Sequence, residues 1–230
     1  MTWQTFLVFI SFLGFAQLAS SALSQLLDHM METLGFFKPQ EDMSEQLSQS
    51  WSLLLYATLI GPITEELVFR AAGLRALEKY GKVFAIVMTA LAFGMFHANF
   101  DQLFFATIIG FGFGYLTFEY SIWWAIFYHI FNNLVLSQGL HYLGTHVNMN
   151  VAEWVQILVF LGGTISFTIV LILKRKAIFH YIQGKPTSTR CLPKKHVFLL
   201  VLGLGPWDNS YVLTSIFKRI LISKRGVLDP

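Results

Sequence analysis

The chain has 230 residues, of which 55% are hydrophobic and only 13% are charged. Soluble domains carry about 25% charged residues, so this composition indicates a membrane protein and argues against a soluble enzyme. The single cysteine, Cys191, excludes an internal disulfide framework and a multi-cysteine metal site. The net charge is +3, but most Lys and Arg residues follow Glu153, many beside apolar runs. That distribution indicates membrane topology rather than nucleic-acid binding.

Six apolar stretches come close to the length needed to cross a bilayer core about 30 Å thick as helices. In chain order they are Trp3–Leu27, Trp51–Gly73, Val83–His97, Leu103–Glu119, Ile122–Leu140 and Trp154–Leu173. The first lacks a basic start and exceeds the usual signal-peptide core of about 7–15 residues, so we expect a retained span. The sequence therefore predicts an all-α polytopic membrane protein with a bundle of about six transmembrane helices.

The domain organisation follows from where the apolar stretches end. Residues 1–176 form the predicted transmembrane domain, and the basic, apolar tail of residues 177–230 is expected in the cytoplasm or at the membrane interface. A seventh span within residues 196–217 is the alternative for this tail. That span would have to contain Asp208 and Asn209.

The charges in the loops predict the orientation. The segment between the first two spans, residues 28–50, is mainly acidic, whereas residues 75–82 and the end of the sixth span at 174–176 are basic. Basic loops face the cytoplasm, so we expect both termini inside and the acidic loop outside. The remaining outer turns are expected near 99–101 and 141–153.

Three glycines in the fourth span, Gly110, Gly112 and Gly114, alternate with larger residues. No strand precedes them, as a nucleotide-binding fingerprint would require. We interpret them as a small-residue surface against which neighbouring helices pack.

The second span carries three charged residues, Glu65, Glu66 and Arg70. An unpaired charge near mid-membrane costs about 2.5–3.5 kcal/mol. Glu66 and Arg70 are four residues apart and share a helix face, so we expect an ion pair between them. Glu65 is left without a partner on its own helix, which suits a carboxylate that accepts a proton as a general base. The alternative is that both glutamates only hold the bundle together.

Two further spans each carry a histidine, and Asn133 shares a helix face with the second one, His129. Glu65 and His97 lie at equal distances along the chain from Gly81. A helical hairpin that turns at Gly81 would therefore bring them to the same depth, about 24 Å from the turn.

Three motifs occur in this order over four spans: Glu65-Glu66-x-x-x-Arg70, Phe93-x-x-x-His97 and His129-x-x-x-Asn133. Over residues 51–140 the chain resembles the CPBP family, also called Abi. That family comprises intramembrane endopeptidases related to the CAAX prenyl protease and to bacteriocin-processing and self-immunity proteins. One departure is Ala71 after Arg70, where the family often has glycine.

The resemblance implies a role for each motif residue. Glu65 would be the general base that activates water, assisted by His97. His129 and Asn133 would bind the oxyanion of the tetrahedral intermediate, and the ion pair of the second span would support the site. The resemblance also implies a catalytic core within residues 51–140.

A water nucleophile also agrees with the residues themselves, because no Gly-x-Ser-x-Gly elbow occurs and the single cysteine lies in the tail. Zinc is the alternative, with Glu65, His97 and His129 as its ligands. The His-Glu-x-x-His signature is absent, and Arg70 would oppose a cation nearby. We therefore expect a metal-free site without a cofactor.

The expected partners are the lipid bilayer and a membrane-associated peptide or protein substrate, prenylated or not, and no nucleic acid. The expected location is a bacterial cell membrane. One rival function is a non-catalytic bacteriocin self-immunity membrane protein. A proton-coupled transporter would use the same Glu and His residues as a relay, but the chain has no internal repeat to support it.

Overall fold

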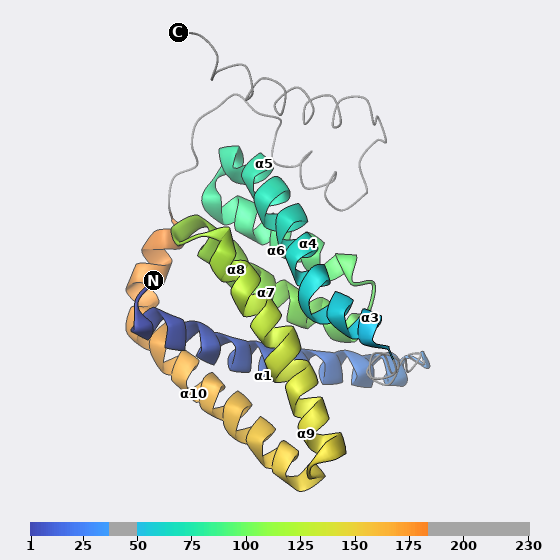
Figure 1. Cartoon of the computed structure of the whole chain (residues 1–230). Coiled ribbons are helices and arrows are strands. Elements are labelled where there is room, and N and C mark those ends of the chain that lie inside the picture. The colour runs from blue at the N-terminus through green and yellow to red at the C-terminus, as the bar shows by residue number, and fades with distance from the viewer. Residues whose placement is uncertain (37–49, 184–230) are drawn as a thin grey trace, which may run out of the picture. The chain divides into compact units, whose positions relative to one another are not determined.

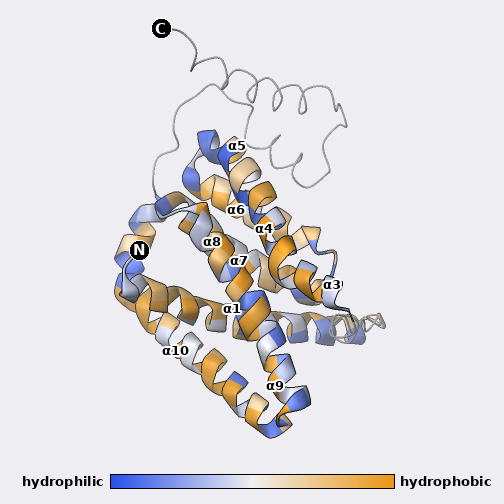
Figure 2. Cartoon of the chain, viewed as in Figure 1, coloured by the Kyte–Doolittle hydropathy of each residue, from blue (hydrophilic) through white to orange (hydrophobic). Residues whose placement is uncertain are grey.

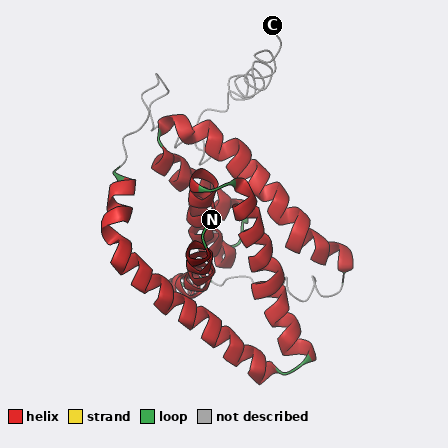
Figure 3. Cartoon of the chain, turned by 60° about the vertical axis from the view of Figure 1, so that its left-hand side comes forward, coloured by secondary structure: helices red, strands yellow, loops and turns green. Residues whose placement is uncertain are grey.

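The computed structural model describes residues 1–36 and 50–183 of the chain. Every regular element within these residues is a helix, which confirms the predicted all-α class (Figure 3). The predicted seventh span or interfacial helix at residues 196–217 lies outside the described residues.

Six continuous helices account for the described residues. The first is α1 (Trp3–Thr33). The second runs without a break through α3 (Trp51–Leu55), η1 (Tyr56–Ile60), α4 (Gly61–Glu66), η2 (Leu67–Leu74), α5 (Arg75–Leu77) and η3 (Glu78–Tyr80). The third and fourth are α6 (Lys82–Phe96) and α7 (Phe100–Glu119). The last two are α8 (Ile122–Phe131), continued by η4 (Asn132–Gly139) and α9 (Leu140–His146), and then α10 (Met149–Ile182).

The helices coincide with the six predicted spans, but the first, second, fifth and last of them are longer than predicted. The turn expected at residues 141–153 is confined to Val147 and Asn148, because α9 is helical up to that point. The Asn148 side chain accepts a hydrogen bond from the backbone N–H of Val151 and caps α10. At its other end α10 continues to Ile182, past the basic residues 174–176.

By length and composition, three of the described helices are apolar enough to cross a membrane, namely Trp3–Thr33, Trp51–Tyr80 and Met149–Ile182. The hydropathy colouring in Figure 2 shows hydrophobic residues along much of α1 and α10. Only Ala152 and Phe160 are buried in α10, and many of its other apolar side chains are exposed and therefore available to lipid. The chain is an all-α membrane protein. The number of crossings and the side of the termini stay predictions.

The hydrophobic core lies between α1, α6, α7 and α8 (Figure 1). Its buried members are Phe9, Phe12, Leu13, Ala16, Phe93, Ala106, Ile109, Phe113, Leu116, Ala125 and Tyr128. The Tyr128 hydroxyl donates a hydrogen bond to the carbonyl oxygen of Phe6, at 3.1 Å, which ties α8 to α1. The core therefore fixes α8, which carries His129, against the N-terminal helix.

Close packing at small residues joins the helices, because lipid is as apolar as their side chains and gives little hydrophobic driving force. A side chain on Gly110 or Gly112 would collide with a neighbouring helix, and one on Gly114 would be tightly packed against it, at 3.3 Å. The contacted residues are Ala90, Phe12 and Ile86, respectively. The predicted small-residue surface is confirmed.

The crossing of α1 and α10 offers a matched test of this packing. A Cβ on Gly163 would lie 3.0 Å from the Ser11 carbonyl oxygen and 3.1 Å from the Gly14 Cα, whereas a Cβ on Gly162 would meet nothing within 4 Å. We expect Gly163→Ala to destabilise the protein by about 1–3 kcal/mol, the usual cost of overpacking. Gly162→Ala should leave stability unchanged or slightly raised. Thermal unfolding in detergent checks this, and equal stability of both variants would contradict the close crossing.

Candidate active site

The two glutamates of the second helix lie where an α-helical segment is followed by a π-helical one. Glu65 and Glu66 end α4, which has a π-helical segment on each side, η1 before it and η2 after it. Pro62 lies in the first turn of α4 and has no N–H to donate to the preceding turn. A π segment changes the phase of the side chains that follow it, and such segments are frequent at functional sites.

The expected ion pair between Glu66 and Arg70 is present and fully buried. Arg70 Nε lies 3.2 Å from Glu66 Oε2, and both side chains are 0% exposed. The contact is too misaligned to count as a hydrogen bond, so it acts through charge. Arg70 Nη2 also donates to the carbonyl oxygen of Gly110 at 3.4 Å, and the guanidinium lies 4.4 Å from the ring centre of Phe93. Arg70 therefore joins α7 and α6 to the second helix.

His129 lies between the two glutamates. Its Nδ1 is 3.0 Å from Glu66 Oε1, and its Nε2 is 3.6 Å from Glu65 Oε2. The ring is also enclosed by the aromatic side chains of Phe93 and Phe113, at ring-centre distances of 5.7 and 5.3 Å. Glu65 thus has a partner from another helix, although it has none on its own.

His97 directly follows α6, and its tautomer can be derived from its contact. Its Nδ1 lies 2.8 Å from the carbonyl oxygen of Phe93. A carbonyl oxygen only accepts, so Nδ1 carries the hydrogen. In the neutral ring Nε2 then has a lone pair and can accept a proton.

Asn133 lies in η4, one helical turn after His129. Its Nδ2 donates to the carbonyl oxygen of Ala57 at 2.9 Å, and its Oδ1 accepts from Asn132 Nδ2 at 3.0 Å. These two contacts fix the orientation of the amide. An amide nitrogen has two hydrogens, so one N–H of Asn133 is left to bind another acceptor.

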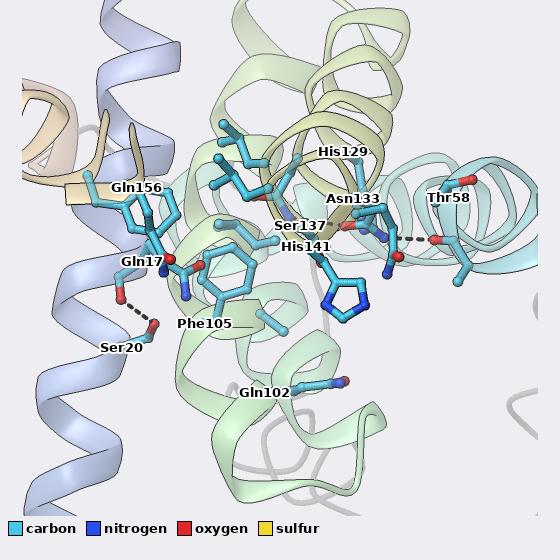
Figure 4. A pocket seen from close by; sticks show the side chains of 18 of the residues that line it. Gln17, Ser20, Thr58, Gln102, Phe105, His129, Asn133, Ser137, His141 and Gln156 are labelled. Atoms are coloured by element: carbon cyan, nitrogen blue, oxygen red, sulfur yellow. Dashed lines mark hydrogen bonds between the residues drawn. The ribbon is translucent and has the colours of Figure 1, made fainter. Parts of the chain in front are cut away.

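A cavity of about 1070 Å³ brings the predicted residues together (Figure 4). Glu65, His97, His129 and Asn133 all line it, whereas Glu66 and Arg70 do not. The Glu65 side chain is 23% exposed and the Glu66 side chain is 0% exposed. Of the two glutamates, Glu65 is the one that a water molecule in the cavity can reach.

The residues named for the alternative zinc site line the cavity without grouping closely. Within the described ranges, no three His, Cys, Asp or Glu side chains are grouped closely enough to hold a metal ion. Glu65, His97 and His129 line one cavity but do not form such a group.

The wall of the cavity also contains polar residues that the sequence analysis did not single out. They include Gln17 and Ser20 on α1, Gln102 on α7, Asn132 in η4, His141 on α9 and Gln156 on α10. Asn132 lies within the third motif, next to Asn133, but no spacing links the other five to the motif residues. The only available signal was their polarity inside a predicted span.

Comparison with known proteins agrees with this site. A family model described as type II CAAX prenyl endopeptidase Rce1-like matches residues 47–135, which include all three motifs. Over this segment, less than half of its length, the chain is similar to the CPBP family that its three motifs resemble. A Bacillus subtilis (strain 168) protein named "Putative membrane peptidase YdiL" is 35% identical over 83 residues. That match covers 35% of the chain and 34% of the relative, so the chain matches about a third of the relative's length. No solved structure matches the chain.

Proposed function

We propose that the protein is an intramembrane endopeptidase in which Glu65 activates a water molecule to hydrolyse a peptide bond. The observation that carries this proposal is the contrast between two adjacent glutamates. Glu65 reaches the cavity beside His129, whereas Glu66 is buried and neutralised by Arg70. A general base must touch the water from which it takes a proton. Glu65 meets that requirement.

The other cavity residues supply the remaining roles. The Nε2 atom of His97 has the lone pair needed to assist in removing a proton from water, since Nδ1 is committed to the Phe93 carbonyl. The free N–H of Asn133 and the Nε2 of His129 can donate to the oxyanion that forms when water attacks the peptide carbonyl. Donors placed in advance for that charge commonly contribute most to catalysis.

The His129 ring lies between the two carboxylates of the second helix. Two carboxylates face the ring, and Arg70 balances only one of them. The Nδ1 atom of His129 faces Glu66, and its Nε2 atom faces Glu65 and the cavity. In this arrangement Glu66 orients His129 and Arg70 holds Glu66. Neither would touch the substrate.

The proposed substrate is a membrane-associated peptide or protein, and nucleic acid is not a partner. The cavity lies among apolar helices, so a substrate with a lipid-embedded part can reach it without leaving the membrane. The description of the matched family, a prenyl endopeptidase, adds prenylated peptides to the candidates.

The proposal is tested by hydrolysis. Purified protein in liposomes is incubated with quenched fluorescent peptides, some prenylated and some with an apolar unmodified end, and cleavage products are identified by mass spectrometry. We expect endoproteolytic cleavage that requires Glu65. A self-immunity protein without catalysis, the rival function, would bind such a peptide and release no fragment.

We expect the activity to be independent of metal. Arg70 lies beside the carboxylates, and a positive charge there disfavours a bound cation. Activity should survive exhaustive chelation, and elemental analysis of the purified protein should find well below one equivalent of zinc. Activity that is lost to a chelator and restored by zinc would contradict this mechanism.

We propose that the protein lies in a bacterial cell membrane with both termini and the basic turn after the second helix in the cytoplasm. Cysteine labelling checks this orientation in a Cys191→Ser background. An impermeant thiol reagent should label Val147→Cys in intact cells, because Val147 is exposed between α9 and α10 on the predicted outer side. It should label Glu78→Cys only after lysis. The reverse pattern would show the opposite orientation.

A further inference from the structure

The cavity has a second polar wall, which the motif residues do not explain. Gln17 projects from α1 and Gln156 from α10, and both line the same cavity as Glu65 and His129. Figure 4 shows the two glutamines on the opposite side of the view from His129 and Asn133. Both lie outside residues 47–135, so the family match assigns them no role.

Both amides are available to a ligand. Within the described residues, neither the Gln17 nor the Gln156 side chain has a hydrogen-bond partner; the bond from the Ser20 hydroxyl goes to the backbone oxygen of Gln17. Gln17 is partly buried and Gln156 is exposed, so both amides are open to a molecule in the cavity. Each amide offers two donors and one acceptor, which matches the alternating N–H and C=O groups of a peptide backbone.

A peptide that is cleaved in this cavity needs hydrogen-bond partners for its backbone. An extended backbone that enters from lipid carries N–H and C=O groups that need hydrogen bonds. In many proteins an extended peptide forms its backbone hydrogen bonds with the edge strand of a sheet. The described part of this chain has no strand. The cavity side chains are therefore the groups that can replace a strand edge.

We propose that Gln17 and Gln156 form a subsite that hydrogen-bonds the backbone of an extended substrate at a distance from the scissile bond. The subsite deepens the proposed function and rests on it. Both side chains are neutral amides and therefore suit the peptide backbone. Glu153, three residues before Gln156 on α10, lines the same cavity. The glutamines are positioning residues, and their contribution is to binding rather than to the chemical step.

Binding to an inactive protein tests the subsite without relying on hydrolysis. In the Glu65→Gln background in lipid bicelles, fluorescence anisotropy measures the Kd of a dye-labelled peptide of about ten residues, which spans at most about 36 Å. The peptide has a neutral polar half and a leucine-rich half. Gln17→Leu and Gln156→Leu should each raise its Kd about 2- to 10-fold, the range for a lost hydrogen bond.

Gln25→Leu is the matched control on the same helix. Gln25 is exposed, donates to the Ser21 hydroxyl at 3.2 Å and does not line the cavity. The control should bind the peptide as the parent does. In the active protein, the two cavity variants should raise KM by the same factor as Kd and leave kcat within about 2-fold.

Ester-substituted peptides separate hydrogen bonding from an altered fold. Replacing one backbone amide by an ester removes one N–H donor. At the position that faces the subsite, this change should weaken binding to the parent protein and have no further effect on the Gln17→Leu or Gln156→Leu variant. If the glutamines had only a structural role, the loss of binding caused by the ester and the loss caused by the glutamine substitution would be additive.

Two results would overturn the subsite: an unchanged Kd in both folded cavity variants, or no binding of the peptide by the parent protein. If the peptide binds in a glutamine-dependent way and the wild-type protein cleaves no peptide, the proposed protease function fails and the subsite stands. If cleavage is normal and the cavity variants behave like Gln25→Leu, the subsite fails alone.

Discussion

Glu65→Gln should reduce peptide hydrolysis by at least about 10²-fold while the protein still folds and inserts, since general-base catalysis typically contributes 10²- to 10⁴-fold. The substitution keeps the size of the side chain and removes its ability to accept a proton. Glu65 is partly exposed to the cavity and lies 3.6 Å from His129, so the neutral amide leaves no fully buried charge without a partner. Initial rates in liposomes and thermal unfolding of the same preparation measure the two effects.

The control for this substitution is Glu78→Gln, on the same continuous helix. Glu78 makes an exposed ion pair with Arg75 at 3.2 Å, and exposed pairs contribute little to stability. Loss of this ion pair in Glu78→Gln should leave the rate of peptide hydrolysis unchanged. Near-normal turnover by a well-folded Glu65→Gln protein would exclude Glu65 as the base and with it the proposed mechanism.

Parts of the site that depend on one helix could be predicted from the sequence. The spacing of Glu66 and Arg70 places them on one face whatever the rest of the fold does, and the structure contains the pair. The turn at Gly81 likewise depends only on the local sequence. Its φ of 116° lies in a region that favours glycine. Glu65 and His97, which the chain distances predicted at equal depth from this turn, both line the cavity.

Parts that depend on helix phase and on distant packing could not be predicted. In a regular α-helix, adjacent residues point about 100° apart, so contact of one histidine with both Glu65 and Glu66 is not an expected result. The π segments on either side of α4 have no reliable sequence signature, although Pro62 is one local cause. Gln17 and Gln156 line the cavity because α1 crosses α10, and no periodicity within either helix reports that crossing.

Glu66 and Arg70 should behave as one unit in stability. Each single substitution, Glu66→Gln or Arg70→Met, leaves a charge without its partner in a fully buried place, and such changes cost about 3–5 kcal/mol. The double variant removes both charges at nearly constant volume, so it should be more stable than the sum of the two losses predicts. Unfolding free energies of the four proteins, measured in bicelles, give the coupling, which we expect to be at least about 0.5 kcal/mol.

The exposed pair Arg75–Glu78 is the matched control for burial, because it has the same closest distance of 3.2 Å on the same continuous helix. Solvent screens that pair, so its coupling should stay at or below about 1 kcal/mol and fall with added salt. The buried coupling should exceed it and be insensitive to salt. Loss of Glu66 should also lower activity, because His129 loses the acceptor that orients its ring. Strictly additive stability losses at Glu66 and Arg70 would mean that the two charges are not coupled, and Arg70 would then act through Gly110 and Phe93 alone.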